Sequence, residues 1–196
     1  MSKSIVMLKN VRLAFPVLKE AERFDASNTK SEARYSANLL FSKENDAMYK
    51  ECVAAMHAAA AAKWGDSKAA AAIKGLTASL KVALADGDMK ADKYDGFEGA
   101  WSISAHAKES TPPRLLDRDK TELPRTSSKI YAGCYVNASI EFWAQDNQYG
   151  KRINAQLRGV QFAADGDAFG GARAASADEF DTVEGVDEDA GDSDFA

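Results

Sequence analysis

The sequence contains few of the residues from which metal sites and disulfide frameworks are built. Among its 196 residues there are two cysteines, Cys52 and Cys134, and two histidines, His57 and His106. Two cysteines in unrelated contexts exclude a disulfide framework and a four-cysteine metal site, and make a reducing compartment the default. The histidines lie far apart and outside any metal-ligand spacing. We therefore predict neither a metal nor another cofactor.

Long hydrophobic runs are absent as well. No apolar stretch approaches the roughly 20 residues that a helix needs to cross a bilayer. Near the amino terminus, Lys9 and Arg12 interrupt the segment MSKSIVMLKNVRL too early for a secretory signal. The sequence therefore predicts a cytoplasmic protein.

Catalytic sequence motifs are missing too. The chain has no phosphate-cradling GxxxxGK[ST], no GxGxxG after a strand and no GxSxG. Asp86 and Asp88 flank Gly87 as a pair of acids, but Asp and Gly are also the residues that tight turns require, and we favour the turn. We predict that the protein is not an enzyme. Because catalytic carboxylates can converge from distant segments, an enzyme that processes nucleic acid is an alternative.

Negative charge is concentrated at one end of the chain. The formal net charge is −5, yet residues 176–196 hold nine acidic residues and no basic one. The remaining 25 basic and 21 acidic residues give the body of the chain a charge of +4. A mildly basic body tied to an acidic segment differs physically from a uniformly acidic protein.

The most regular pattern lies in residues 130–171. Apolar and polar residues alternate from Tyr135 to Trp143, which predicts a half-buried strand with Val136, Ala138, Ile140 and Phe142 facing the core. The turn cluster DNQYG follows at 146–150, where Gly150 can take a positive φ. A second strand is predicted from Lys151 to about Phe162. The two strands together predict a long hairpin with one apolar face.

The other face of this hairpin combines aromatic rings with cations. Such a face suits single-stranded nucleic acid, because every base has a π-face and every nucleotide a phosphate. Aromatic residues in strands more often pack than bind, so a structural role for Tyr135 and Trp143 is the alternative. The residues that we predict to contact nucleic acid, on this hairpin and on other outward positions, are Arg34, Lys108, Arg114, Tyr135, Trp143, Tyr149, Arg152 and Arg158.

Alternation predicts further strands over residues 5–15, 34–41, 79–88 and 100–110. In the first of these, Val11, Leu13 and Phe15 share the inward face, and Pro16 ends the strand because proline cannot donate to a ladder. In the last, the residues predicted to face outward are Ser102, Ser104, His106 and Lys108.

Helical spacing of apolar residues predicts one principal helix after the second strand. Ser42 is the predicted N-cap, with Glu44 and Asp46 in the first turn, where the helix dipole favours negative charge. The helix ends at Gly65. A short second helix is predicted over the alanine-rich residues 67–74, closed by Gly75.

These elements predict a mainly β protein with one principal helix. Strands with many non-local pairings favour an OB-fold-like small β-barrel with a long hairpin, and a β-sandwich is the alternative. We assign residues 1–173 to this domain. Residues 174–196 are rich in Ala, Asp, Glu, Gly and Ser, too polar to bury a core, and predict a disordered acidic carboxyl-terminal tail.

The last residues of the tail place an aromatic side chain beside acids. Attached to a basic domain, an anionic segment can occupy a cationic groove until DNA displaces it. Its terminal aromatic residue can then dock in a pocket of a partner. We therefore predict partner binding by Asp192, Asp194 and Phe195. A tail that only aids solubility is the alternative.

Several segments of the chain carry a resemblance to a known family. They are KNVRLAFP (9–16), ARYSANLLFSKE (33–44), IYAGCYVNASIEFWAQDN (130–147), LRGVQFAADGDAFGG (157–171) and the acidic tail with its phenylalanine. In these segments the chain resembles bacteriophage single-stranded-DNA-binding proteins of the OB-fold type. The tail departs from many such proteins, because it ends in Phe195-Ala196 and not on the aromatic residue.

The resemblance implies sequence-independent binding of single-stranded DNA during phage DNA replication or recombination in the cytoplasm of the host bacterium. It also implies that the protein protects single-stranded DNA and recruits phage or host replication and recombination proteins through its tail. Binding of RNA stays open, because stacking and phosphate contacts discriminate poorly between the two sugars, and so does homo-oligomer formation. A non-catalytic phage structural or assembly protein is the alternative from another functional class.

Overall fold

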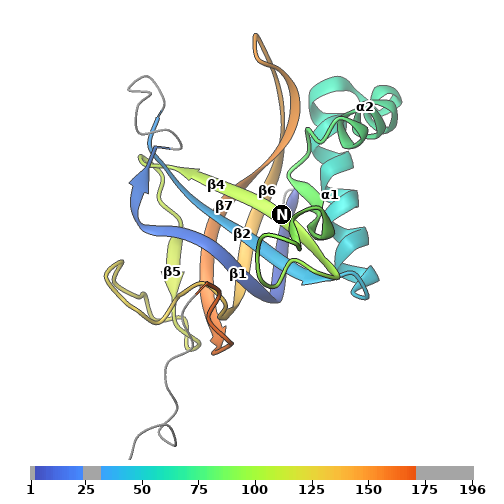
Figure 1. The fold of residues 1–196 in the computed structure, drawn as a ribbon. Coiled ribbons are helices and arrows are strands. Elements are labelled where there is room, and N and C mark those ends of the chain that lie inside the picture. The colour runs from blue at the N-terminus through green and yellow to red at the C-terminus, as the bar shows by residue number, and fades with distance from the viewer. Residues whose placement is uncertain (1–2, 24–31, 171–196) are drawn as a thin grey trace, which may run out of the picture.

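The computed structural model describes residues 3–23 and 32–170 (Figure 1). The long strands of this part are β1 (Ile5–Glu22), β2 (Arg34–Ser42), β4 (Ala100–Lys108), β6 (Tyr135–Asn147) and β7 (Gly150–Ala164). Shorter elements are β3 (Leu84–Asp86), β5 (Arg114–Leu116) and the 3-10 helix η1 (Gly87–Lys90). The α-helices are α1 (Asp46–Trp64) and α2 (Asp66–Ala78), which lie together on one side of the sheet in Figure 1.

The long strands close into a barrel. They are hydrogen-bonded in the order β4-β2-β1-β6-β7, and a short parallel pairing between β4 and β7 joins the two ends. In that pairing Ala105 lies opposite Ala155 and His106 opposite Gln156. The short strands extend the sheet, β3 beside β4 and β5 beside β7. The predicted OB-fold-like barrel is therefore confirmed, as is the mainly β fold class.

The long hairpin of β6 and β7 supplies much of the core. Val136, Ala138, Ile140 and Phe142 are each at most 1% exposed, as the alternation predicted. Burying a large apolar side chain contributes about 1.5–3 kcal/mol relative to leaving it in water. Because side chains of a strand alternate between faces, burial of these four turns the intervening polar residues outward.

The first strand differs from the prediction. β1 does not end at Pro16 but continues to Glu22, and Phe15 is 48% exposed while Val11 and Leu13 are buried. The pairing of β1 with β2 shifts register between Ala14 and Val17, which indicates a β-bulge. A bulge leaves a residue outside the ladder, so Pro16 is tolerated there and Phe15 turns to the outer face.

The helix boundaries also differ from the prediction. Asn45, and not Ser42, caps α1, because its Oδ1 accepts a hydrogen bond from the Met48 amide at 3.1 Å. The Ser42 hydroxyl accepts instead from the Glu44 amide at the end of β2. Gly65 ends α1 as predicted, with a φ of 87°. α2 is longer than predicted, and includes Gly75 within the helix.

Residues 79–88 form less strand than alternation predicted. Only Leu84–Asp86 pair as β3, and Gly87–Lys90 continue as η1. Ser102 is buried, although the alternation of β4 predicted it to face outward. Its register partner Ala85 belongs to β3, and the sequence pattern did not show that this strand pairs with β4.

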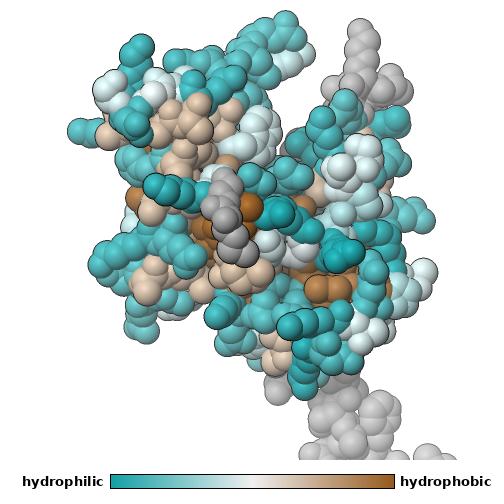
Figure 2. Space-filling model, turned by 180° about the vertical axis from the view of Figure 1, so that it is seen from behind, coloured by the Kyte–Doolittle hydropathy of each residue, from teal (hydrophilic) through white to brown (hydrophobic). Residues whose placement is uncertain are grey.

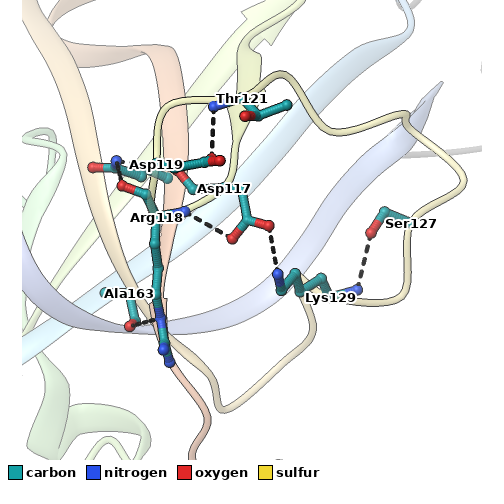
Figure 3. Close-up of polar contacts among 8 residues, drawn as sticks. Asp117, Arg118, Asp119, Thr121, Ser127, Lys129 and Ala163 are labelled. Atoms are coloured by element: carbon teal, nitrogen blue, oxygen red, sulfur yellow. Dashed lines mark hydrogen bonds and ion pairs between the residues drawn. The ribbon is translucent and has the colours of Figure 1, made fainter.

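The segment between β5 and β6 packs against the end of β7 (Figure 3). Arg118 Nε donates to the carbonyl oxygen of Ala163 at 2.8 Å. Asp117 pairs with Lys129 and accepts from the Arg118 amide, and the Lys129 hydrogen bond is the main cause that lowers the pKa of Asp117. The pKa of Asp119 is lowered first by the hydrogen bond from the Thr121 amide. These contacts fix a turn around residues 117–120.

The surface seen from behind is largely hydrophilic (Figure 2). On the left of that view, on the side of α1 and α2, tan areas on the hydrophobic side of the colour scale lie between hydrophilic side chains. No helix in the described ranges is long and apolar enough to cross a membrane.

Candidate nucleic-acid interface

A cleft of about 720 Å³ opens on the outer face of the barrel, between the start of β2 and the hairpin of β6 and β7. It brings together Arg34, Lys108, Trp143 and Tyr149, four of the residues that the sequence predicted for nucleic acid. These residues come from β2, β4, β6 and the turn after β6, so only the closed barrel makes them neighbours. OB-folds bind oligonucleotides on the equivalent surface, flanked by the loop after the first strand and by a hairpin loop.

The aromatic side chains of the cleft are exposed. Trp143 is 45% exposed and Tyr149 is 78% exposed. Trp143 pairs in register with Asn154 on the outward face of the hairpin, beside Phe142, which fills the core. The packing role that competed with stacking at the sequence level therefore does not describe Trp143. An exposed indole on a rigid strand offers a flat apolar surface to a base.

The two cations of the cleft face each other across neighbouring strands, so their positive charges repel. Arg34 and Lys108 are directly opposite in the pairing of β2 with β4. Like charges opposite each other in a sheet are destabilising. Neither side chain forms an ion pair with another described residue, whereas Lys43, Lys50, Lys129 and Lys151 each pair with an aspartate. An anion between Arg34 and Lys108 would relieve this repulsion.

Other polar side chains also line the cleft. One is acidic, Glu32, and the uncharged ones are His106, Thr111, Gln145, Asn154 and Gln156. Burial, together with the smaller effect of the nearby charge of Arg34, lowers the pKa of His106 to about 4, so the ring is neutral near pH 7. Its Nδ1 has no hydrogen-bond partner among the described residues. The alternation of side chains along the strands places the strand residues among these on the outer face. His106 lies beside Gln156 only because β4 pairs with β7, and the sequence does not reveal this pairing.

Other predicted cations surround the cleft without lining it. Arg152 and Arg158 are exposed on β7, on the outward side that also carries Asn154 and Gln156. Arg114 is exposed on β5 and lies opposite Gly159 in register. The three arginines extend the positive surface along β7 and onto β5.

Tyr135 lies away from the cleft, at the opposite end of β6. It is half-buried, and the Arg12 guanidinium sits 5.1 Å from its ring centroid. Arg12 Nε also donates to the carbonyl oxygen of Gly133 at 2.9 Å. Tyr135 therefore packs against Arg12 outside the cleft, and its stacking on DNA stays a prediction.

The predicted partner-binding residues Asp192, Asp194 and Phe195 lie outside the described residues, as does the predicted disordered tail. Within residues 3–23 and 32–170, no group of three or more His, Cys, Asp or Glu residues is placed to hold a metal ion.

Comparison with known proteins relates the chain to phage proteins. A family model described as "Enterobacter phage Enc34, ssDNA-binding protein" matches residues 4–191. Protein p50 of Acyrthosiphon pisum secondary endosymbiont phage 1 is 37% identical over 185 residues, which cover 94% of this chain and 96% of that protein.

Solved structures resemble the fold. The single-stranded DNA-binding protein from bacteriophage Enc34, solved in complex with ssDNA, is 31% identical with a TM-score of 0.70, over 84% of this chain and 89% of that one. The single-stranded DNA-binding protein gp2.5 of bacteriophage T7 is 15% identical with a TM-score of 0.53, over 93% of this chain and 97% of that one, and shares the fold.

Proposed function

This chain belongs to the family of the Enterobacter phage Enc34 ssDNA-binding protein, and we propose that it binds single-stranded DNA without sequence preference in the cleft between β2, β4 and the hairpin of β6 and β7. The observation that carries the proposal is the convergence in one cleft of two exposed aromatic rings and two cations that form no ion pair with any other described residue. Family membership supports the same function, because the relative after which the family is named is a single-stranded-DNA-binding protein.

The binding mechanism follows from the side chains of the cleft. Bases stack on Trp143 and Tyr149, and each stacked base contributes about 1–3 kcal/mol. Arg34 and Lys108 contact phosphates, and the released counterions make affinity fall with salt. Stacking and phosphate contacts are the same for every base, which accounts for binding without sequence preference.

Selectivity against duplex DNA follows from the same contacts. Base pairing and stacking hide the base faces in a duplex, so only phosphate contacts remain available to the cleft. The body of the chain, with 25 basic and 21 acidic residues, has a small positive charge for those contacts. We therefore expect a hairpin duplex to bind much more weakly than oligo-dT at the same salt concentration.

The test is fluorescence anisotropy of labelled oligo-dT with the full chain and its Trp143→Ala and Trp143→Phe variants. We expect Trp143→Ala to lose about 1–3 kcal/mol of binding free energy and Trp143→Phe, which keeps a ring, to lose less. Because Trp143 is 45% exposed, both variants should unfold at the same urea concentration as the original chain. If Trp143→Ala folds normally and binds oligo-dT with unchanged affinity, the cleft is not the binding site.

The cellular role that we infer is protection of single-stranded DNA during phage replication or recombination in the host cytoplasm, without catalysis. We also infer that the acidic tail recruits phage or host proteins through Asp192, Asp194 and Phe195. Affinity capture of replication proteins from infected cells tests this inference. Phe195→Ala should lose the captured proteins while binding oligo-dT normally. Capture unaffected by both Phe195→Ala and deletion of residues 176–196 would argue against tail recruitment.

A further inference from the structure

Outside the cleft, a second pair of aromatic side chains is exposed on the outer face of the barrel. Phe15 on β1 is 48% exposed and Tyr94, which follows η1, is 45% exposed. Their ring centroids are 4.9 Å apart in an edge-to-face arrangement. Both rings line a groove of about 150 Å³ whose walls include Phe97 and Lys93. The core does not use these two rings fully, so they are available to a ligand.

The backbone at Phe15 is held in an unusual conformation. Its φ is 47°, at the bulge where β1 shifts register against β2. A positive φ in a bulky residue costs about 1–3 kcal/mol and is found mainly where the surrounding structure imposes it, often at binding sites. Here the bulge presents the Phe15 ring on the outer surface, beside Tyr94.

A continuous row of outward positions joins this groove to the cleft. Gln156 on β7 lies opposite His106 on β4, His106 opposite Ser36 on β2, and Ser36 opposite Val17 on β1. Three steps between neighbouring strands of about 4.8 Å span roughly 14 Å. Val17 is two residues from Phe15. A strand of DNA that crosses β4 and β2 from the cleft therefore arrives at Phe15.

The surface along this row is polar and suits an extended nucleic-acid strand. Ser36 follows His106, and next to them the Ser104 hydroxyl donates to the Asn38 side chain at 2.9 Å. At the far end, Lys93 and Asp95 both line the groove, so their charges offset each other. The groove can therefore contribute base stacking but little attraction for phosphate.

We propose that Phe15 and Tyr94 form a second base-stacking site for the strand of single-stranded DNA whose other bases occupy the cleft. This inference rests on the proposed function. A strand that stacks on Trp143 crosses the row from Gln156 to Val17 and places a further base against the Tyr94 and Phe15 rings. The two aromatic sites then set the minimum length of DNA that the barrel holds with full affinity.

The experiment compares oligonucleotide lengths. OB-folds occupy about 4–16 nucleotides, so we use a dT oligomer near the lower limit, which fills the cleft alone, and one near the upper limit. The variants are Tyr94→Ala and Phe15→Asn, since Asn tolerates positive φ and keeps the backbone of the bulge. Met89→Ala is the matched control, because Met89 is 58% exposed on η1 and does not line the groove.

We expect Tyr94→Ala and Phe15→Asn to bind the long oligomer about 5- to 150-fold more weakly and the short one normally. The slope of affinity against salt should be unchanged, because no phosphate contact is lost. Met89→Ala should bind both oligomers normally, and Trp143→Ala should bind both more weakly.

Two results would overturn the second site and leave the proposed function intact. One is normal binding of both oligomers by Tyr94→Ala and Phe15→Asn while Trp143→Ala loses affinity. The same holds if Tyr94→Ala binds both oligomers normally and loses only the binding of a protein partner. The other is an equal loss of affinity for the short and the long oligomer in the groove variants, which would mean that the longer DNA does not extend into the groove. If neither Trp143→Ala nor the groove variants lose affinity, the proposed function fails as well.

Discussion

Single residues show how closely the segment that follows β7 packs against the segment that precedes β6. Gly133 has a φ of 103°, and a Cβ added there would lie 2.1 Å from the carbonyl oxygen of Asp167. Gly150, with a φ of 93°, has no atom within 4 Å of the same added atom. The two glycines therefore separate the effect of backbone conformation from the effect of crowding.

We predict that Gly150→Ala lowers the free energy of unfolding by about 1–2 kcal/mol, the cost of a left-handed conformation in an alanine. Gly133→Ala should lower it by more, because backbone atoms must also move. Urea unfolding of both variants measures the difference. Equal losses would mean that the contact between residue 133 and the carbonyl of Asp167 is loose.

His106 gives the fold a predictable dependence on pH. Burial holds its pKa in the folded protein at about 4, below the ordinary value of 6.5. Between these values the unfolded chain binds more protons, so the free energy of unfolding should fall as pH falls from about 6.5 toward 4. Urea unfolding at pH 7 and pH 5 measures this loss. In His106→Gln the loss should be smaller, and an identical pH dependence would show that His106 is not the group responsible.

At the residue scale, the sequence correctly predicted that Trp143 faces outward. It incorrectly predicted that Phe15 faces inward. Trp143 lies in an unbroken alternation, where one buried neighbour determines the direction of the next side chain. Phe15 lies at a bulge, which reverses the alternation after it. No residue type in residues 14–17 marks the bulge except Pro16, which is equally consistent with the end of a strand.

Among the elements, the hairpin of β6 and β7 carries one wall of the cleft and is attached to α1 on its other side. Trp64 Nε1 donates to Asp146 Oδ2 at 2.9 Å, and Lys151 Nζ lies 5.4 Å from the Trp64 ring centroid and 3.7 Å from the same carboxylate oxygen. Trp64 thus holds the hairpin in place from the side away from Trp143.

We predict that Trp64→Phe, which keeps a ring but loses the hydrogen bond, weakens binding of oligo-dT by about 0.5–1.5 kcal/mol. The reason is that a less restrained hairpin must be ordered when DNA binds. The slope of affinity against salt should stay the same, since Trp64 contacts no phosphate. Asp146→Asn keeps the acceptor for Trp64 and should lose less. Normal binding by Trp64→Phe would mean that the hairpin needs no such restraint.

At the element scale, the sequence predicted where strands and helices lie along the chain better than it predicted which strands pair. Alternation and turn residues located the hairpin, and helical spacing located α1 up to Gly65. It did not reveal that β4 closes on β7 or that β3 joins β4, because these pairings depend on distant segments. The cleft depends on the closure of β4 on β7. Four of its residues could therefore be predicted from the sequence, but not that they lie together in one cleft.

The whole molecule divides its charge between a basic body and an acidic terminal segment. We predict that deleting residues 176–196, which changes the formal charge from −5 to +4, strengthens binding of oligo-dT, most clearly at low salt. A tethered anion reaches an effective concentration near the millimolar range and competes with DNA for the cations. Anisotropy at low and high salt compares the two chains. Equal affinities at every salt concentration would leave the segment a solubilising role.

The central claim, that the cleft binds the phosphates and bases of single-stranded DNA, is tested most directly by a salt titration of oligo-dT binding. With about five cations in contact with phosphates, log K should fall against log salt with a slope of roughly −3.5. Arg34→Ala should make the slope shallower by about 0.7, and Trp143→Ala should lower affinity equally at every salt concentration without changing the slope. An affinity independent of salt would contradict the claim. So would a slope unchanged in Arg34→Ala combined with normal affinity in Trp143→Ala.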